Sequence, residues 1–441
     1  MSRVNEGSDV LFHRPVDIED YLLRCIDQNA NKKVGAESEF FFVSPEGKAI
    51  TVEDGQKAFA SFKKNFEARG LEVSAQSEQH AGRAYVTGLS VKHLGNIDLE
   101  TGHGFEFATD ICNGPGHVLT SERVFFGVLA DVERDINYKS AFTGYAPEYA
   151  EPVPIMRQRS NAVRNSYIER FGEAADLILK VQGSTASTQM NVDAGQDAFH
   201  EVFRALLIAD PALSLHYTDQ TGREYLRKKA YVPLVPEQVN PLVDVWDCRD
   251  NRAAIHCIVE RLMRVHVPFM PSKEGEYIKM PLDPATRQPP TVGEIMERQG
   301  ISERELKNIM TLSQTHPALR RPAVIEVRGP DSIGSAEKIA ELSGHVTRIA
   351  YDKDVRRDLL REFRHFSKQE ICELHHVTAW PHHDQAMKRT IGGKAVSDIV
   401  QAVVEISRMP HPPSSQQHVT QGGLGFNETR PNNGYSEKYV L

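Results

Sequence analysis

The sequence predicts an α+β protein in which a mostly antiparallel, curved sheet forms an open cleft flanked by helices. Short strand-like segments alternate polar and apolar residues, as expected for strands with one wet face and one buried face. Segments with helical spacing separate these strands, but they lack the regular β-α-β alternation that is typical of a parallel sheet.

Five strand-like segments carry acidic or amide side chains on one face and bulky apolar side chains on the other. These segments are Gly35 to Phe41, Asn96 to Glu100, Gly104 to Ala108, Ser187 to Asp193 and Val324 to Arg328. Side chains two residues apart on a strand project from the same face. The pairs with this spacing are Glu37 with Glu39, Asp98 with Glu100, Gln189 with Asn191, and Glu326 with Arg328. A single acidic pair is more often a solvated sheet face, but carboxylates on five such strands would repel one another unless cations lay between them.

Helical patterns surround the strands. They cover 16–30, 51–69, 120–137, 159–167 and 196–208, then two short helices within 295–311, and finally 335–351, 354–366 and 394–409. Four prolines in 280–291 predict a loop. We therefore expect a single domain over residues 1–409 with a helical C-terminal part from about 332, followed by a mobile tail over 410–441.

Composition narrows the class of protein. The 441 residues are 40% hydrophobic, which is ample for a large core, and the net charge of −8 argues against nucleic acid or an anionic membrane as the main partner. No run of eighteen apolar residues and no N-terminal signal region is present, so we expect a cytoplasmic protein. The five cysteines form no C-x-x-C pair, which favours free thiols.

Five motifs in a fixed order carry a resemblance to a known family. They are G-x-E-x-E at 35–39, L-E-x-G-x-x-F-E at 99–106, P-I-M-x-x-R at 154–159, a T-x-Q-x-N-x-D strand at 187–193 with Ser187 in the Thr place, and E-x-R-G at 326–329. In this order and spacing they resemble the glutamate-cysteine ligase family, in particular its plant-like and bacterial carboxylate-amine ligase branch. The resemblance runs from Gly35 to about Asp331.

The resemblance implies a glutamine synthetase-like catalytic fold and an ATP-dependent ligase. Such an enzyme activates the side-chain carboxylate of glutamate as an acyl phosphate and joins it to the amine of cysteine or a related amino acid, as in glutathione biosynthesis. ATP and about two or three Mg²⁺ ions are the expected cofactors, since Mg²⁺ prefers oxygen ligands and neutralises phosphate charge. No P-loop sequence is present, so ATP is expected at the acidic sheet. The expected partners are small-molecule substrates only.

Candidate site residues follow from the charge pattern and from the resemblance. The predicted metal cage is Glu37, Glu39, Glu100, Glu106 and Glu326. Arg328 shares a strand face with Glu326 and is expected, together with Arg159, to stabilise the charge of the transferred phosphoryl group or a substrate. The remaining predicted substrate or ATP contacts are Gln189, Asn191, Arg157, Arg164, Tyr167, Arg249 and Arg252. Arg249 and Arg252 stand in the loop after Cys248, where relatives carry a more acidic turn near the amine site.

Alternatives to this function remain open at the level of sequence. The same carboxylates suit a ligase with a different amine acceptor in a specialised pathway, or a phosphotransferase that leaves a stable phosphorylated guanidine. A non-catalytic relative that binds an amino acid or a nucleotide would be favoured by loss of a cage carboxylate, but all five are present.

Overall fold

The computed structural model describes residues 10–28, 32–149, 157–193, 195, 198–219, 222–271, 277–312, 317–380 and 382–408. The predicted tail over 410–441 and the P-I-M part of the motif at 154–159 lie outside these described residues.

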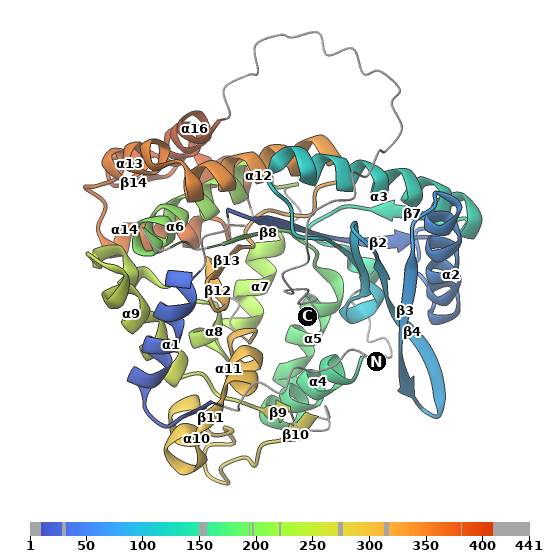
Figure 1. Ribbon diagram of the computed structural model, residues 1–441, viewed down its shortest axis with the longest axis horizontal. Coiled ribbons are helices and arrows are strands. Elements are labelled where there is room, and N and C mark those ends of the chain that lie inside the picture. Colours follow the sequence, from blue (N-terminus) through green and yellow to red (C-terminus); the bar gives the residue numbers. More distant parts are fainter. Residues whose placement is uncertain are drawn as a thin grey trace.

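A nine-stranded antiparallel sheet forms the centre of the molecule (Figure 1). In spatial order its strands are β12 (Ala318–Arg321), β13 (Val324–Val327), β8 (Thr188–Asp193), β2 (Val34–Val43), β6 (Phe105–Thr109), β5 (Gly95–Leu99), β4 (Arg83–Val91) and β3 (Val73–His80), with β7 (Lys139–Ala141) on the far end of β2. The edge strands β12 and β3 do not pair with each other, so the described strands form an open sheet. The predicted α+β class is confirmed, and the five acidic segments are the five consecutive neighbours β13, β8, β2, β6 and β5.

One face of the sheet is covered by three helices, α2 (Val52–Ala68), α3 (Pro115–Ile136) and α12 (Ala336–Tyr351) (Figure 1). A buried phenylalanine cluster fills the space between the strands and α2 and α3. Its members are Phe40, Phe42, Phe59, Phe62, Phe66, Phe105, Phe107 and Phe125. The cluster members on β2 and β6 alternate with polar residues that project from the opposite face, which is the pattern that the sequence predicts.

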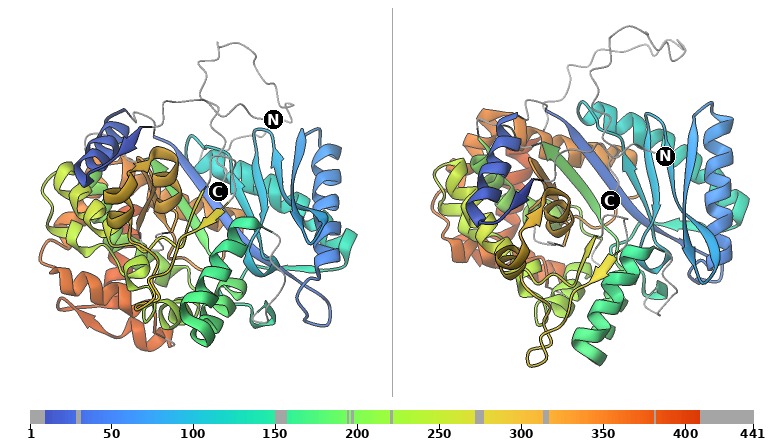
Figure 2. Two further views of the ribbon diagram at one scale, coloured as in Figure 1. Left: turned by 90° about the horizontal axis from the view of Figure 1, so that it is seen from below. Right: turned by 60° about the horizontal axis from the view of Figure 1, so that its bottom comes forward.

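The remaining helices form two further groups. The helical body around α6 consists of α1 (Pro15–Gln28), α6 (Phe199–His216), α9 (Asn251–Met263), α13 (Lys353–Glu362), α14 (Lys368–Val377), α15 (His383–Met387) and α16 (Val396–Ser407), with a small hairpin of β14 (Thr390–Ile391) and β15 (Lys394–Ala395). The second group contains α4 (Gln158–Phe171), α5 (Ala175–Ser184), α7 (Arg223–Tyr231) and α8 (Pro236–Val239), which share a smaller core. Side chains of α10 (Val292–Gln299), α11 (Glu303–Met310) and the hairpin of β9 (Phe269–Pro271) and β10 (Tyr277–Lys279) pack instead into the core of the helical body around α6. A two-residue pairing of β1 (Leu11–Phe12) with β11 (Ile301–Ser302) connects α1 to α11. In the tilted view of Figure 2, β2 and β8 are visible between α10–α11 and the β3–β4 hairpin.

Most predicted helices are confirmed, but several boundaries are wrong. The helix predicted over 196–208 is α6, which continues to His216, and the helix predicted over 354–366 is α13, which ends at Glu362. The pattern places the start of α3 at Thr120, whereas the helix begins at Pro115. Gly114, with φ 150°, breaks the preceding chain, and Pro115 occupies the first turn, where its missing N–H costs nothing. The β3–β4 hairpin was not predicted, because β3 is largely exposed on both faces and has no apolar alternation.

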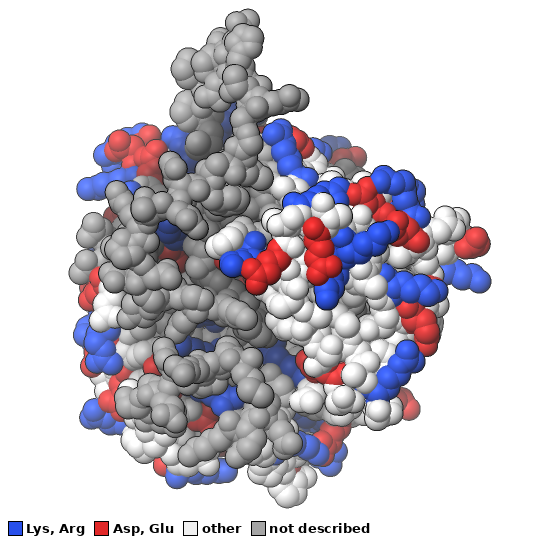
Figure 3. Space-filling model, turned by 45° about the vertical axis from the view of Figure 1, so that its right-hand side comes forward, with Lys and Arg blue, Asp and Glu red and all other residues white. Residues whose placement is uncertain are grey.

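The face that carries α2 and the β3–β4 hairpin shows Lys and Arg interspersed with Asp and Glu (Figure 3). Ion pairs such as Arg69 with Asp131 and Lys64 with Asp135 account for part of this mixture. All five cysteines are free thiols, as predicted. Within the described ranges, no helix has the length and apolar character needed to cross a membrane.

Candidate active site

The polar face of the sheet brings the predicted acidic and amide residues into one array. Strand register places Glu39 opposite Glu106, and Glu106 opposite Asp98 on the next strand. Glu37 lies opposite Gln189, and Asn191 lies opposite Glu326. Since all these pairs face the same side, residues as far apart in sequence as Glu37 and Glu326 share one surface.

A tight connection between β5 and β6 aligns Glu100 with Glu106. The turn Thr101–His103 contains Gly102 at φ 75°, and a Cβ atom there would lie 2.5 Å from the Cα of Gly183. Glycine is therefore required both by the backbone angle and by the close approach of α5. The Glu100 N–H donates to the Gly104 carbonyl at 2.7 Å, which closes the turn and leaves both glutamates on the polar face.

Amide and hydroxyl donors hold the carboxylates of β2. Asn191 Nδ2 donates to Glu37 Oε1 at 2.8 Å, and Gln189 Nε2 donates to Glu39 Oε1 at 2.8 Å. Ser187 donates to Glu39 Oε2 from its backbone N at 2.6 Å and from its Oγ at 3.0 Å. The T-x-Q-x-N motif, with Ser187 in its first place, thus positions both glutamates of the G-x-E-x-E motif.

Arginines bind the carboxylates at both ends of the array. Glu326 Oε2 accepts from Arg320 Nε at 2.9 Å and from Arg328 Nη1 at 3.2 Å. Arg157 Nη1 lies 3.3 Å from Glu100 Oε1, and its Nη2 lies 3.8 Å from Asp98 Oδ1. Arg320 on β12 was missed at the sequence level, because β12 has no acidic residue that would mark it as part of the site. Asp98 was recognised as the same-face partner of Glu100, but it was left out of the predicted cage.

Burial and mutual repulsion raise the pKa of the carboxyl groups in this array. Burial, followed by the negative charge of Glu326, raises the pKa of Glu37 to about 7. The positive charges of Arg328 and Arg320 oppose this shift. Burial raises the pKa of Glu106 well above its ordinary value, and the charges of Glu37 and Glu100 add to this shift. The pKa values of Glu39, Glu100 and Asp98 are also raised, in each case chiefly by burial. A bound cation would favour the ionised forms of these groups.

Several buried polar atoms of this surface have no hydrogen-bond partner among the described residues. They are Glu106 Oε1, Gln189 Oε1 and Arg328 Nε. The Arg159 guanidinium is held by the Thr311 hydroxyl at 2.5 Å, and within the described chain no carboxylate forms an ion pair with it. Burial accordingly lowers the pKa of Arg159. Unsatisfied acceptors and a partly buried arginine without an ion pair among the described carboxylates indicate a site for both a cation and an anionic ligand.

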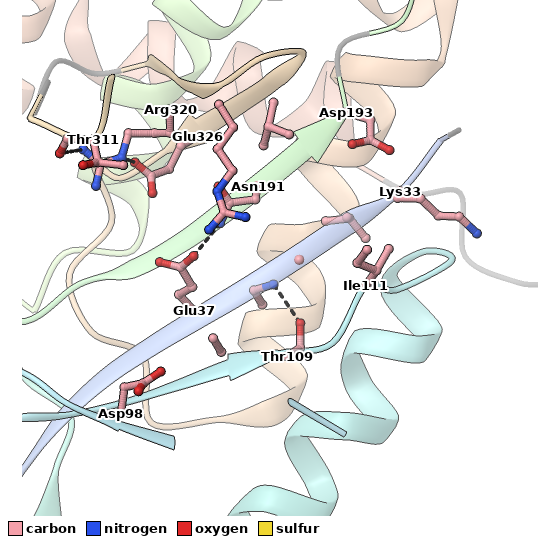
Figure 4. A pocket seen from close by; sticks show the side chains of 16 residues that line it. Lys33, Glu37, Asp98, Thr109, Ile111, Asn191, Asp193, Thr311, Arg320 and Glu326 are labelled. Carbon is pink, nitrogen blue, oxygen red and sulfur yellow. Dashed lines mark hydrogen bonds and ion pairs between the residues drawn. The ribbon is translucent and has the colours of Figure 1, made fainter. Parts of the chain in front are cut away.

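Two connected compartments make up the cleft above this face. The strand-end compartment is lined by Lys33, Gly35, Thr109, Asn191, Asp193 and Arg321. Its volume, including the part that is open to solvent, is about 770 Å³. The arginine compartment is lined by Glu78, Glu100, Arg157, Arg159, Tyr277 and Arg328, with a corresponding volume of about 1370 Å³. Glu37 and Arg320 line both compartments. Figure 4 shows Glu37 on β2, Asp98 on β5 and Glu326 on β13 at the strand-end compartment.

Four predicted substrate contacts do not line this cleft. The Tyr167 side chain is buried among Phe171 and Tyr231, with its hydroxyl 3.4 Å from Gln238 Oε1. Arg164 lies further along the same helix and lines neither compartment. Arg252 pairs with Asp20 at 3.1 Å and lines a separate surface groove with Glu19 and His256, and Arg249 is exposed just before α9. These four predicted contacts therefore lie outside the two compartments of the cleft.

The five predicted metal ligands share the polar face, but the described residues contain no ready-made group of three or more acidic, His or Cys side chains arranged around a metal. Existing contacts explain this absence. The carboxylates of Glu37 and Glu39 accept hydrogen bonds from side-chain amides, whereas those of Glu100 and Glu326 form ion pairs with arginines. Glu106, whose Oε1 has no partner in the described chain, is the carboxylate best placed to take a cation without breaking an existing contact.

An open antiparallel sheet with a charged cleft on one face places the structure in the α+β class. In the comparison with known protein families, residues 33–214 match the model of glutamate-cysteine ligase family 2 (GCS2), which supports the resemblance found in the sequence over that part of the chain. The match supports a ligase of the glutamate-cysteine ligase type.

Other comparisons add little. A bifunctional glutathione synthetase from Pasteurella multocida aligns at 12% identity and a TM-score of 0.29, covering 90% of this chain and 53% of that structure. The chain thus spans about half the length of that protein, and a likeness this weak carries no weight for function. No curated protein sequence matches the chain.

Proposed function

We propose that this protein is an ATP-dependent carboxylate-amine ligase that activates the side-chain carboxylate of glutamate and joins it to the amine of cysteine or a related amino acid. The observation that carries the proposal is a row of partly or fully buried carboxylates next to partly buried arginines in one cleft. Such a surface suits a reaction that needs both cations and anionic substrates. The family match over 33–214 supports the same reaction type.

The proposed reaction has two steps. A carboxylate oxygen of glutamate attacks the γ-phosphorus of ATP, the bond to the bridging oxygen breaks, and ADP leaves. The amine then attacks the acyl carbon, phosphate leaves with its oxygen, and the amine loses a proton. Arg328 and Arg159 are the groups proposed to bind the negative charge that gathers on the transferred phosphoryl group or on a substrate carboxylate.

Mg²⁺ fits the residues of this cleft. Glu106 offers an unpartnered buried oxygen, and the pKa of its carboxyl is raised by burial and by the charges of Glu37 and Glu100, a repulsion that a divalent cation would relieve. Glu37, Glu39, Glu100, Glu106 and Glu326 are the proposed ligands, with Glu326 and Glu100 also pairing with arginines. When bound, the ion supplies charge neutralisation at the phosphate oxygens.

The two compartments give room for separate substrates. We infer that they hold the nucleotide and the amino acids on either side of Glu37 and Arg320, which line both. The proposal includes a cytoplasmic location and no nucleic-acid partner, in keeping with the net charge of −8.

Mass spectrometry of reactions containing ATP, Mg²⁺, glutamate and a panel of amines tests the proposal. Oxygen-18 in the side-chain carboxylate of glutamate should appear in the released phosphate, and a γ-glutamyl amide should form with at least one amine. Release of AMP and pyrophosphate would mean adenylation and would overturn the proposed route. A stable phosphorylated guanidine would instead identify a phosphotransferase, and nucleotide binding without turnover would identify a non-catalytic protein.

A further inference from the structure

The chain that follows β13 carries Arg328 out of the sheet, and buried side chains of two helices hold its backbone. Arg223, at the start of α7, donates from Nη2 to the Arg328 carbonyl at 3.1 Å and also to the Gly329 carbonyl. Its Nε donates to Asp331 Oδ1 at 2.9 Å. Arg223 is only 2% exposed, so its planar guanidinium binds residues 328, 329 and 331 of this segment inside the protein.

Two residues of α6 complete the set of contacts around Gly329. Asp210 Oδ1 accepts from the Gly329 N–H at 2.9 Å, and Ser214 Oγ donates to the Gly329 carbonyl at 2.6 Å. A Cβ atom on residue 329 would lie 2.5 Å from Asp210 Oδ1 and 2.9 Å from the Cβ of Ser214. Both backbone polar groups of the residue after Arg328 are therefore satisfied by side chains that fit closely around a glycine.

We propose that Arg223, with Asp210 and Ser214, is a positioning residue that fixes Arg328 for phosphoryl transfer. The proposal rests on the function proposed above. Arg328 has one described ion-pair partner, Glu326, and its Nε is unpartnered, so the side chain is held mainly from its own backbone. A catalytic group misplaced by about 1 Å can cost about a hundredfold in rate, and buried hydrogen bonds behind it are what prevent such movement.

A second buried arginine provides a matched control. Arg356 on α13 pairs with Glu201 at 3.2 Å and donates from Nη1 to the Ala350 carbonyl at 3.0 Å. It therefore binds a carboxylate and a backbone carbonyl as Arg223 does, but its partners Glu201 and Ala350 are not part of the segment that carries Arg328. Loss of such contacts should lower the stability of the protein at both positions, but it should lower turnover only at Arg223.

The first test compares Arg223→Lys with Arg356→Lys. Lysine keeps the charge but cannot bridge two carbonyls and a carboxylate in a fixed plane. We expect Arg223→Lys to lower kcat at least about tenfold while the KM values for ATP and glutamate change less than about twofold. Arg356→Lys should leave kcat within about twofold of the wild type. Equal kcat for Arg223→Lys and the wild type would overturn the proposal, and so would equal losses in both variants.

Ser214→Ala is a milder variant if Arg223→Lys does not fold. It removes one hydrogen bond to the Gly329 carbonyl and should lower kcat about threefold without changing KM. A double-mutant cycle then tests whether the effect passes through Arg328. When Arg328→Lys is already present, adding Ser214→Ala or Arg223→Lys should lower kcat by less than about a further factor of two. If the second substitution lowers kcat by the same factor as it does in the wild type, the two effects are independent and the proposal is contradicted.

Hydrogen exchange separates this proposal from the proposed function. Exchange of the Gly329 amide, followed by NMR or on peptides covering 324–331, should be faster in Arg223→Lys than in the wild type and unchanged in Arg356→Lys. If the wild type has no ligase activity, the proposed function fails, but the exchange still reports whether Arg223 holds this segment. Unchanged exchange in Arg223→Lys would overturn the positioning role by itself.

Discussion

The two faces of the same strands differ sharply in composition, and the difference separates chemistry from stability. On the cleft face, β2 and β6 present Glu37, Glu39 and Glu106. On the opposite face, the adjacent residues Phe40 and Phe105 belong to the phenylalanine cluster against α2 and α3. A period of two residues thus assigns a reactive surface to one side of each strand and a core to the other.

A buried carboxyl group on each face sharpens this comparison. On the helix-covered side, burial raises the pKa of Glu122 to about 8, and only a hydrogen bond from Ser38 opposes the shift. On the cleft side, burial and Glu326 raise the pKa of Glu37 to about 7, against the opposing charges of Arg328 and Arg320. Glu122 is therefore mainly neutral at pH 7, whereas Glu37 sits among charges that a ligand or a cation can rebalance.

The largest expected effect is on the apolar face. The Phe105 ring is fully buried, with ring centroids of Phe42 and Phe59 each 5.2 Å away. Phe105→Ala should lower the free energy of unfolding by about 3–5 kcal/mol, because it removes buried area and leaves a cavity. Denaturant unfolding measures the loss. Activity per folded molecule should stay within about threefold, and a selective loss of turnover at full stability would break the division between the two faces.

Glu37→Gln tests the cleft face. It keeps the shape of the side chain but removes the charge that Asn191 and the proposed cation share, so turnover should fall at least about a hundredfold, equivalent to about 2.7 kcal/mol. The melting temperature should not decrease, because the variant also removes a costly buried charge. Initial rates over a Mg²⁺ titration provide the measurement, with Glu122→Gln as the control on the other face. Full activity of Glu37→Gln would refute its assignment to the metal cage.

Glu122 also makes a prediction about pH and stability. Its folded-state pKa of about 8 lies above the ordinary value of 4.5, so its stabilising contribution is complete below about pH 4.5 and is lost as the pH rises toward 8. Glu122→Gln does not titrate. Between about pH 6 and 8 its stability relative to the wild type should therefore increase by about 2 kcal/mol. Urea unfolding of both proteins at the two pH values checks this, and a constant difference would show that Glu122 is not buried as a neutral acid.

Much of the site could be predicted from the sequence because its residues lie on strands with a strict alternation. The spacing of Glu37 with Glu39, and of Gln189 with Asn191, determines which side chains share a face once the strands pair. The pairing partners of each strand are long-range, so the ion pair between Arg320 and Glu326 could not be foreseen from a short strand without acidic residues. The position of Arg252 depends on how α9 packs on α1, which no local pattern encodes.

The smallest expected effect concerns Arg252, which the sequence pattern placed at the amine acceptor. Its side chain is 62% exposed and pairs with Asp20, which is itself 48% exposed, in a groove that shares no described residue with either compartment of the cleft. Exposed ion pairs contribute about 0.2–1 kcal/mol, so Arg252→Ala should lower stability by no more than about 1 kcal/mol. The KM of the acceptor should change less than about twofold, because no charge is removed from the cleft.

Arg157→Ala, which releases Glu100 within the cleft, is the contrasting variant and should raise a substrate KM or lower kcat at least about tenfold. A rise in the acceptor KM for Arg252→Ala alone would restore the loop after Cys248 to the amine site and would remove the distinction between the cleft and the α1–α9 groove.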